Sequence, residues 1–346
     1  MDRIPHMGMD SELTIVIVIR NQASLLKGFL RDGVPTGNFN LLFADGSTND
    51  KVERYLKRNP PPNAQYIRFP PDISWAAYLK KLAAASAMVR TPFAMLADPD
   101  DYVLPRGVME ALALLSNDAT ISCAGSGLSV RQAWHWAKRW EELGRWQLST
   151  LSFESAEEAI RVQVETLGGL PLTYYHVHRT DALVGATEKL AALCPGRPFV
   201  DQYFSLCSMS EGSIAATEYP SYVHAISQFT PPAARVPHFP ESSNTSVEAV
   251  ESWYEGFRYL GTSVMGSWPE WAEHWAMDLR NKPRLLAAPR NRMRKMLSRI
   301  PGTSDSKERT LNWVTTDLLP VLDAYRRLFS PETLRLIRVG KRDILE

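Results

Sequence analysis

Cysteine is scarce in this chain of 346 residues, which contains only three. Cys123, Cys194 and Cys207 are widely spaced, odd in number and form no CxxC pair, so they indicate neither a disulfide framework nor a zinc site. We therefore expect reduced thiols in or near the core of a cytoplasmic protein.

Long apolar runs and an excess of charge are also lacking. No stretch approaches the roughly 18 apolar residues of a membrane span, and residues 1–12 contain no apolar segment typical of a signal peptide. Lys and Arg number 39 against 38 Asp and Glu, a formal net charge of +1. These features argue against an integral membrane protein, classical secretion and a nucleic-acid partner.

The sequence does contain a regular alternation of apolar strands and amphipathic helices in its first hundred residues. The run Leu13–Ile19 is continuous and rich in β-branched residues, as in a strand buried on both faces. Alternation of this kind predicts an α/β fold with a doubly wound, Rossmann-like mixed sheet. The predicted strands are 13–19, 40–44, 65–69 and 93–96, and the predicted helices are 21–30, a helix ending at Leu56, and 74–89.

Later residues continue the pattern and then change character. A proline cluster at residues 231–245 predicts a linker. We expect a tail at 1–11, a catalytic domain at 12–230 and a C-terminal α-helical extension at 246–346. The further predicted elements are helices 105–116, 131–146, 156–167 and 203–210, and strands 121–130, 174–179 and 221–226.

Aspartates follow two of the predicted strands. Asp98, Asp100 and Asp101 come directly after the apolar run 93–96, and Asp45 follows the strand at 40–44. Ligands bind at the carboxyl ends of the strands in such sheets, where carboxylates could hold a divalent cation with a polyphosphate. An ordinary acidic turn is the alternative.

Several motifs together resemble a known family. The strand 14–19, Asp45-Gly46-Ser47-Thr48 and Asp98-Pro99-Asp100-Asp101 look like family 2 glycosyltransferases with the GT-A fold. The segments 199–204, 211–214 and 222–227 resemble the family's acidic helix start, glycine turn and closing strand. The segments 81–82, 91–93, 153–155 and 175–180 look closer to a bacterial subgroup.

The resemblance implies an inverting, metal-dependent transfer of a sugar, of the hexosyltransferase type, from a nucleoside diphosphate sugar to a hydroxyl group. Asp98 would face the ribose or the sugar, and Asp100 and Asp101 would bind Mn²⁺ or Mg²⁺. His224 would bind the metal or the diphosphate, although a core histidine is the alternative. The acceptor would be a glycan, a lipid-linked molecule or a protein, in bacterial surface polysaccharide synthesis or protein glycosylation.

Four more residues have predicted roles at this site. Asp45 would bind the base or ribose, with a turn aspartate as the alternative, and Arg20 would also contact the donor. Lys81 could reach the diphosphate, although a solvated lysine is the default. Asp201 is the candidate general base, and a helix N-cap is its alternative role.

Two other functions remain open. A nucleotidyltransferase would need a glycine-rich and basic loop after the first strand, where this chain has Arg20-Asn21-Gln22. A catalytically silent module could bind a partner through its tryptophan-rich helices. The basic, amphipathic segment 290–300 either packs on the catalytic domain or contacts the inner face of a membrane peripherally.

Overall fold

The computed structural model describes residues 12–34, 39–99, 101–131, 146–149, 173–193 and 200–226, together with isolated positions at 152, 154, 155 and 158 and between 255 and 273. For 32–33, 128–131, 146–149, 201–203 and 223–226 it describes the backbone alone. The predicted linker, the segment 290–300, most of the predicted helix 156–167 and almost all of the C-terminal extension lie outside these residues.

A seven-stranded sheet forms the centre of the described fold, in the order β10-β6-β9-β4-β1-β2-β3. β4, β1, β2 and β3 run parallel, whereas β9 is antiparallel to both of its neighbours. The predicted α/β class with a mixed sheet is therefore confirmed. The strands are β1 (Leu13–Ile19), β2 (Asn40–Asp45), β3 (Ala64–Arg68), β4 (Phe93–Ala97), β6 (Ile121–Ala124), β9 (Val177–Arg179) and β10 (Ser213–Ala215).

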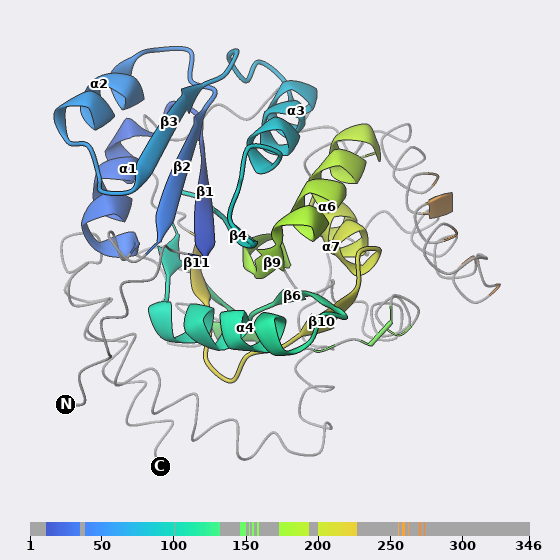
Figure 1. Ribbon diagram of the computed structural model, residues 1–346. Coiled ribbons are helices and arrows are strands. Elements are labelled where there is room, and N and C mark those ends of the chain that lie inside the picture. The colour runs from blue at the N-terminus through green and yellow to red at the C-terminus, as the bar shows by residue number, and fades with distance from the viewer. Residues whose placement is uncertain are drawn as a thin grey trace, which may run out of the picture.

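Helices cover this sheet on both faces, as Figure 1 shows. α1 (Ala23–Gly28) and α2 (Lys51–Arg58) lie on one side of β1–β3, and α3 (Trp75–Ser86) lies on the other. α3 packs against α6 (Thr180–Leu193), which packs against α7 (Val200–Met209). Because both faces are covered, every residue of β1 and β4 is buried, which explains their uninterrupted apolar sequences.

Local interactions fix where two of the helices begin, and two short helical turns complete the connections. α3 starts after Ser74, whose hydroxyl oxygen accepts the Ala77 N–H at 3.2 Å. α4 (Pro105–Asn117) begins with a proline, which suits the first turn because it lacks an N–H. α1 continues into a π-helical turn, η1 (Phe29–Gly33), and η3 (Thr173–Tyr175) is a short 3₁₀ turn.

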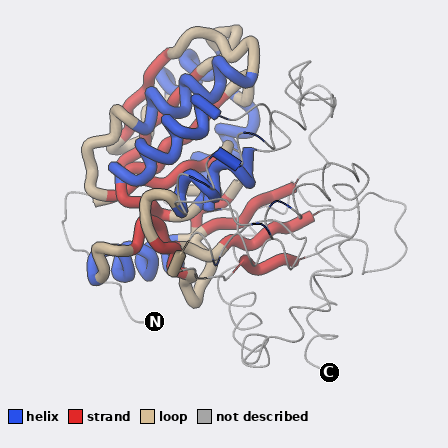
Figure 2. Tube along the Cα trace, turned by 90° about the vertical axis from the view of Figure 1, so that its right-hand side faces the viewer, coloured by secondary structure: helices blue, strands red, loops and turns tan. Residues whose placement is uncertain are grey.

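A second sheet, with the order β5-β11-β7-β8, stands beside the first (Figure 2). The sequence predicted one strand over 121–130, but the chain forms β6 in the large sheet and then crosses to β7 in the small one. The small sheet comprises β5 (Tyr102–Val103), β7 (Gly127–Arg131), β8 (Trp146–Ser149) and β11 (Tyr222–Ile226).

Crowding explains why the chain changes sheets at this point. A Cβ atom on Gly127 would overlap the Tyr222 ring, and one on Gly125 would press on Ser221 and His176. The Ser221 N–H also donates to the Ser126 carbonyl at 2.8 Å, which fixes the crossing. The two glycines therefore permit close backbone approach where the sheets meet.

Other elements also differ from the prediction. The ends of the predicted helix 131–146 belong to β7 and β8, and residues 132–145 lie outside the description. The sequence reading missed α6 and β10. Cys123 and Cys207 are buried in the core, as predicted, while Cys194 is not described. In the described part of the chain, no helix combines the length and apolar character that crossing a membrane requires.

Candidate functional site

The carboxyl ends of the parallel strands bring the predicted residues to one edge of the large sheet. β1 lies between β2 and β4 and runs parallel to both, so Arg20 after β1, Asp45 at the end of β2 and Asp98 after β4 share that edge. The edge is where ligands bind in open α/β sheets. The predicted clustering of Asp45 and Asp98 at one end of the sheet is therefore confirmed.

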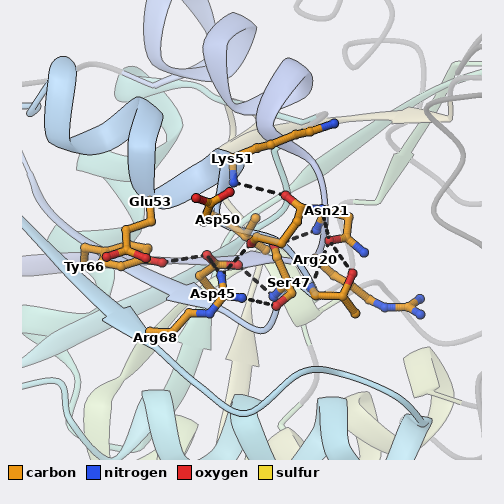
Figure 3. A network of polar contacts seen from close by, with 12 residues as sticks. Arg20, Asn21, Asp45, Ser47, Asp50, Lys51, Glu53, Tyr66 and Arg68 are labelled. Atoms are coloured by element: carbon orange, nitrogen blue, oxygen red, sulfur yellow. Dashed lines mark hydrogen bonds and ion pairs between the residues drawn. The ribbon is translucent and has the colours of Figure 1, made fainter.

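Asp45 is completely buried, and both of its carboxylate oxygens accept hydrogen bonds (Figure 3). Oδ1 accepts the Ser47 N–H at 2.8 Å, and Oδ2 accepts the Tyr66 hydroxyl and Arg68 Nη1, each at 2.7 Å. The first bond is the turn-aspartate arrangement that the sequence left as an alternative. The structure thus shows Asp45 organising the turn, and its contact with a nucleotide stays a prediction.

Tyr66 and Arg68 are site residues that the sequence reading missed. They lie two residues apart on β3, so they share one face of the strand. Arg68 lies directly opposite Asp45 in the strand register. Arg68 also donates to the carbonyls of Ser47 and Asn49, and its side chain is 34% exposed. Burial and the hydrogen bond to Asp45 raise the pKa of Tyr66, so its hydroxyl stays a donor. The spacing of two residues between Tyr66 and Arg68 in a predicted strand could have indicated that both side chains lie on the same face of the sheet as a strand-end aspartate.

Asn21 ties the loop after β1 to the turn after β2. Its backbone has a φ of 56°, a left-handed conformation that asparagine tolerates better than most residues. Its N–H donates to Ser47 Oγ at 2.7 Å, and its Oδ1 accepts from the Thr48 N–H at 3.0 Å and Asn49 Nδ2 at 2.8 Å. The Asp45-Gly46-Ser47-Thr48 turn is thus held from two strands.

Arg20 and Lys81, both predicted to contact the donor, differ in their surroundings. Arg20 follows β1 and is partly exposed; burial lowers its pKa, and nearby Asp72 opposes that effect. Lys81 is not the solvated lysine expected by default, because its ammonium is buried, donates to the Ile19 carbonyl at 2.9 Å and pairs with Asp72. Contact of either residue with a nucleotide stays a prediction.

The carboxylates after β4 lie in a different setting. The Tyr175 hydroxyl donates to Asp98 Oδ2 at 2.7 Å, and the Asp101 N–H donates to the Asp98 carbonyl at 3.1 Å. Asp101 is buried, whereas Asp100 lies outside the described residues. Burial raises the pKa of Tyr175 well above its usual value, and the nearby charges of Asp101 and Asp98 raise it further. Tyr175 is therefore a neutral donor that orients Asp98.

His224 and Asp201 are described by their backbones alone. β11 is antiparallel to β5, with Tyr222 opposite Val103 and Val223 opposite Tyr102. The predicted closing strand thus runs beside the aspartate turn. Asp201 is the second residue of α7, which begins at Val200; the alternative of an N-cap is therefore wrong, because the helix starts before it. Its role as a base stays a prediction.

The donor chemistry of the turn after β4 suits a hard divalent cation, because carboxylate oxygens are the preferred ligands of Mg²⁺ and Mn²⁺. Within the residues that the structure describes, no group of three or more His, Cys, Asp and Glu side chains is close enough to hold a metal ion. Asp100 and the side chains of Asp201 and His224 are outside that set.

Comparison with known proteins gives matches only among solved structures. No protein-family model matches the chain, and no curated protein does either. A structure of S. aureus TarS residues 1–349 in complex with UDP-GlcNAc is 14% identical, with 96% of this chain and 91% of that chain covered and a TM-score of 0.48. The same fragment in complex with UDP is 14% identical, with 96% and 88% covered and a TM-score of 0.45.

A longer S. aureus TarS structure is 13% identical, with a TM-score of 0.43. Here the alignment covers 96% of this chain and 53% of that chain, so this chain spans about half the length of the longer TarS structure.

Proposed function

We propose that the protein is an inverting, metal-dependent glycosyltransferase that moves a sugar from a nucleoside diphosphate sugar to a hydroxyl group of an acceptor. One observation carries the proposal. Asp98 is oriented by a buried tyrosine at the carboxyl end of a parallel strand, beside the buried Asp101 and on the same sheet edge as the turn that contains Asp45.

The turn after β4 would hold the cation. Asp100, Asp101 and His224 are the proposed ligands, and Asp98, oriented by Tyr175, would face the ribose or the sugar. Mn²⁺ or Mg²⁺, when bound, supplies positive charge that stabilises the departing diphosphate. The carboxylates' own part is to place that charge and to bind the donor at the sheet edge.

The opposite end of the same edge would hold the nucleoside. The turn at 45–48 is fixed by bonds to Asn21, Tyr66 and Arg68, so it presents a preorganised surface. Arg68 is partly exposed there and Arg20 follows the neighbouring strand, which places two cations near a negatively charged ligand. Asp45 and Lys81 would support this surface from within.

Asp201 would remove the proton of the acceptor hydroxyl as the new bond forms. A carboxylate can act as the base when its surroundings raise its pKa toward the working pH. α7 begins at Val200, so Asp201 lies in the first turn of that helix. We propose a glycan, lipid-linked or protein acceptor and a location in the cytoplasm, with residues 290–300 as a candidate membrane contact.

A donor hydrolysis assay tests the proposal. The full chain is incubated with a panel of nucleoside diphosphate sugars, beginning with UDP-GlcNAc, in Mn²⁺, in Mg²⁺ and with a chelator. We expect slow release of the nucleoside diphosphate that needs the cation and is lost in Asp98→Asn. Binding of nucleotide without any turnover, with or without candidate acceptors, would instead favour the catalytically silent module.

Asp201→Asn tests the proposed base separately. The amide keeps the size of the carboxylate but cannot accept the proton, so transfer should fall by about 10²–10⁴-fold while donor affinity changes little. Transfer within a few-fold of the unsubstituted protein would exclude Asp201 as the base. A product with retained anomeric configuration would contradict the inverting mechanism.

A further inference from the structure

A buried ion pair joins the ends of three parallel strands at the proposed donor site. Lys81 extends from α3 and donates to the Ile19 carbonyl, the last residue of β1, at 2.9 Å. It also pairs with Asp72, which follows β3. The Asp72 N–H in turn donates to the carbonyl of Gly46, just after β2, at 2.8 Å. These two residues therefore link the segments that follow all three strands.

Gly46 is the point where the pair meets the turn. Its N–H donates to the same Ile19 carbonyl, at 3.0 Å, so that oxygen accepts from both Gly46 and Lys81. A Cβ atom at position 46 would overlap the Asp72 carboxyl group. Glycine is thus required here because the carboxylate lies directly against the backbone of the turn.

Lys81 and Asp72 are deeply buried. The Lys81 and Asp72 side chains are 2% and 0% exposed. Burial lowers the pKa of Lys81 and raises that of Asp72, and each opposes the shift of the other. Asp45 and Asp98 also raise the pKa of Lys81, so its ammonium lies within electrostatic reach of both halves of the site.

We propose that Asp72 and Lys81 are positioning residues for donor binding. They hold the turn 45–48 in register with the loop after β1, and so place Arg20, Asn21 and Ser47 where a nucleotide would bind. Lys81 donates to the Ile19 carbonyl and the Asp72 N–H donates to the Gly46 carbonyl, so the pair contacts the backbone that it is proposed to position. This inference rests on the proposed glycosyltransferase function.

The test separates positioning from stability by comparing Lys81→Met with the double variant Asp72→Leu/Lys81→Met. The single variant leaves a buried carboxylate without its cation and should be unstable. The double variant replaces the pair with apolar groups of similar size, which usually restores stability. The matched control is Lys189→Met, which removes the ion pair with Glu211 between α6 and the end of α7, away from the sheet edge.

Amide hydrogen exchange and UDP binding in Mn²⁺ are then measured on the full chain. In the folded double variant we expect the N–H groups of Gly46 and Thr48 to exchange faster, because their acceptors, the Ile19 carbonyl and Asn21 Oδ1, are no longer held in register. UDP affinity should fall roughly tenfold to a hundredfold, as small misplacements at a site commonly cause. The control should match the unsubstituted protein in both measurements.

Three results are decisive. Unchanged exchange in the turn of the folded double variant overturns the proposal, and so does unchanged UDP affinity. Faster exchange in the turn, together with an unsubstituted protein that binds no nucleoside diphosphate in any cation, supports positioning of the turn by the pair and overturns the proposed glycosyltransferase function.

Discussion

Two aspartate-bearing regions lie at the same edge of the sheet, and different kinds of side chain contact their carboxylates. After β2 and β3, Asp45 pairs with Arg68 and Asp72 pairs with Lys81, so internal cations balance both carboxylates. After β4, the neutral hydroxyl of Tyr175 donates to Asp98. A tyrosine hydroxyl adds no positive charge of its own when it orients a carboxylate.

The difference indicates a division of labour. The first turn is held rigidly by hydrogen bonds and by the Asp45–Arg68 ion pair, as expected of a surface that recognises a nucleoside. In the second turn a tyrosine hydroxyl orients the Asp98 carboxylate, which suits the proposed cation site. Substitutions at the first turn should therefore mainly reduce stability and distort the binding surface. Substitutions at the second turn should mainly reduce cation-dependent activity.

The largest expected effect is the loss of protein stability when the buried ion pair beside the first turn is broken. Asp72→Ala leaves the buried Lys81 ammonium without its partner and should lower the free energy of unfolding by about 3–5 kcal/mol. Urea denaturation followed by circular dichroism measures this. A loss below about 1 kcal/mol, typical of an exposed ion pair, would show that the pair is not buried as described.

Removing the hydroxyl of the second turn should cost less stability and more function. Tyr175→Phe loses one hydrogen bond to a charged acceptor, about 1.5–3 kcal/mol, and removes the hydroxyl that orients Asp98. Donor hydrolysis should fall at pH 7. Tyr174→Phe is the matched control, because its hydroxyl bonds to the Tyr78 hydroxyl at 3.0 Å. Equal loss of activity in both variants would contradict a specific role for Tyr175.

Two buried histidines beside Tyr175 predict how stability depends on pH. Burial lowers the pKa of His176 from 6.5 to about 3 and that of His178 to about 4. Below pH 6.5 the unfolded chain binds protons that the folded protein does not, so stability is full above that pH and falls toward pH 4. At pH 5 each histidine should cost about 2 kcal/mol.

His176→Leu checks this dependence, because neither ring nitrogen of His176 has a hydrogen-bond partner in the structure. The stability lost between pH 7.5 and pH 5 should shrink by about 2 kcal/mol in the variant. The same loss in both proteins would mean that His176 is not buried in its neutral form.

The smallest effect on stability is expected at an exposed ion pair on α2. Lys57 on α2 contacts Glu53 at 2.6 Å, but its side chain is 73% exposed. Lys57→Ala should change the free energy of unfolding by less than about 0.5 kcal/mol, as for other exposed helix pairs. A change as large as that of Asp72→Ala would undermine the distinction between buried and exposed pairs.

The sequence predicted the central strands because burial on both faces leaves a continuous apolar signal, as in β1 and β4. It failed for β5, β8 and β10, which are too short to show a periodicity. α6 was missed although Leu183, Ala186 and Leu190 have helical spacing and are buried, so its signal was present.

The site shows the same limit. Asp45 and Asp98 were found because each directly follows an apolar run, a pattern that can be recognised within one short segment of the sequence. Tyr175 reaches Asp98 across 77 positions, and Asn21 reaches Ser47 across 26, so no local pattern marks either contact. Lys81 has a local partner in Asp72, nine residues away, but only the fold shows that both are buried.

Calorimetric titration of UDP tests the central claim most directly, because it measures donor binding without needing an acceptor. The unsubstituted protein is titrated in Mn²⁺ and with a chelator, and Asp98→Asn is titrated in Mn²⁺. We predict binding in Mn²⁺ that the chelator abolishes and that Asp98→Asn weakens by about tenfold or more, since the amide keeps the acceptor for Tyr175 but loses the charge. Equal affinity under all three conditions would contradict the account.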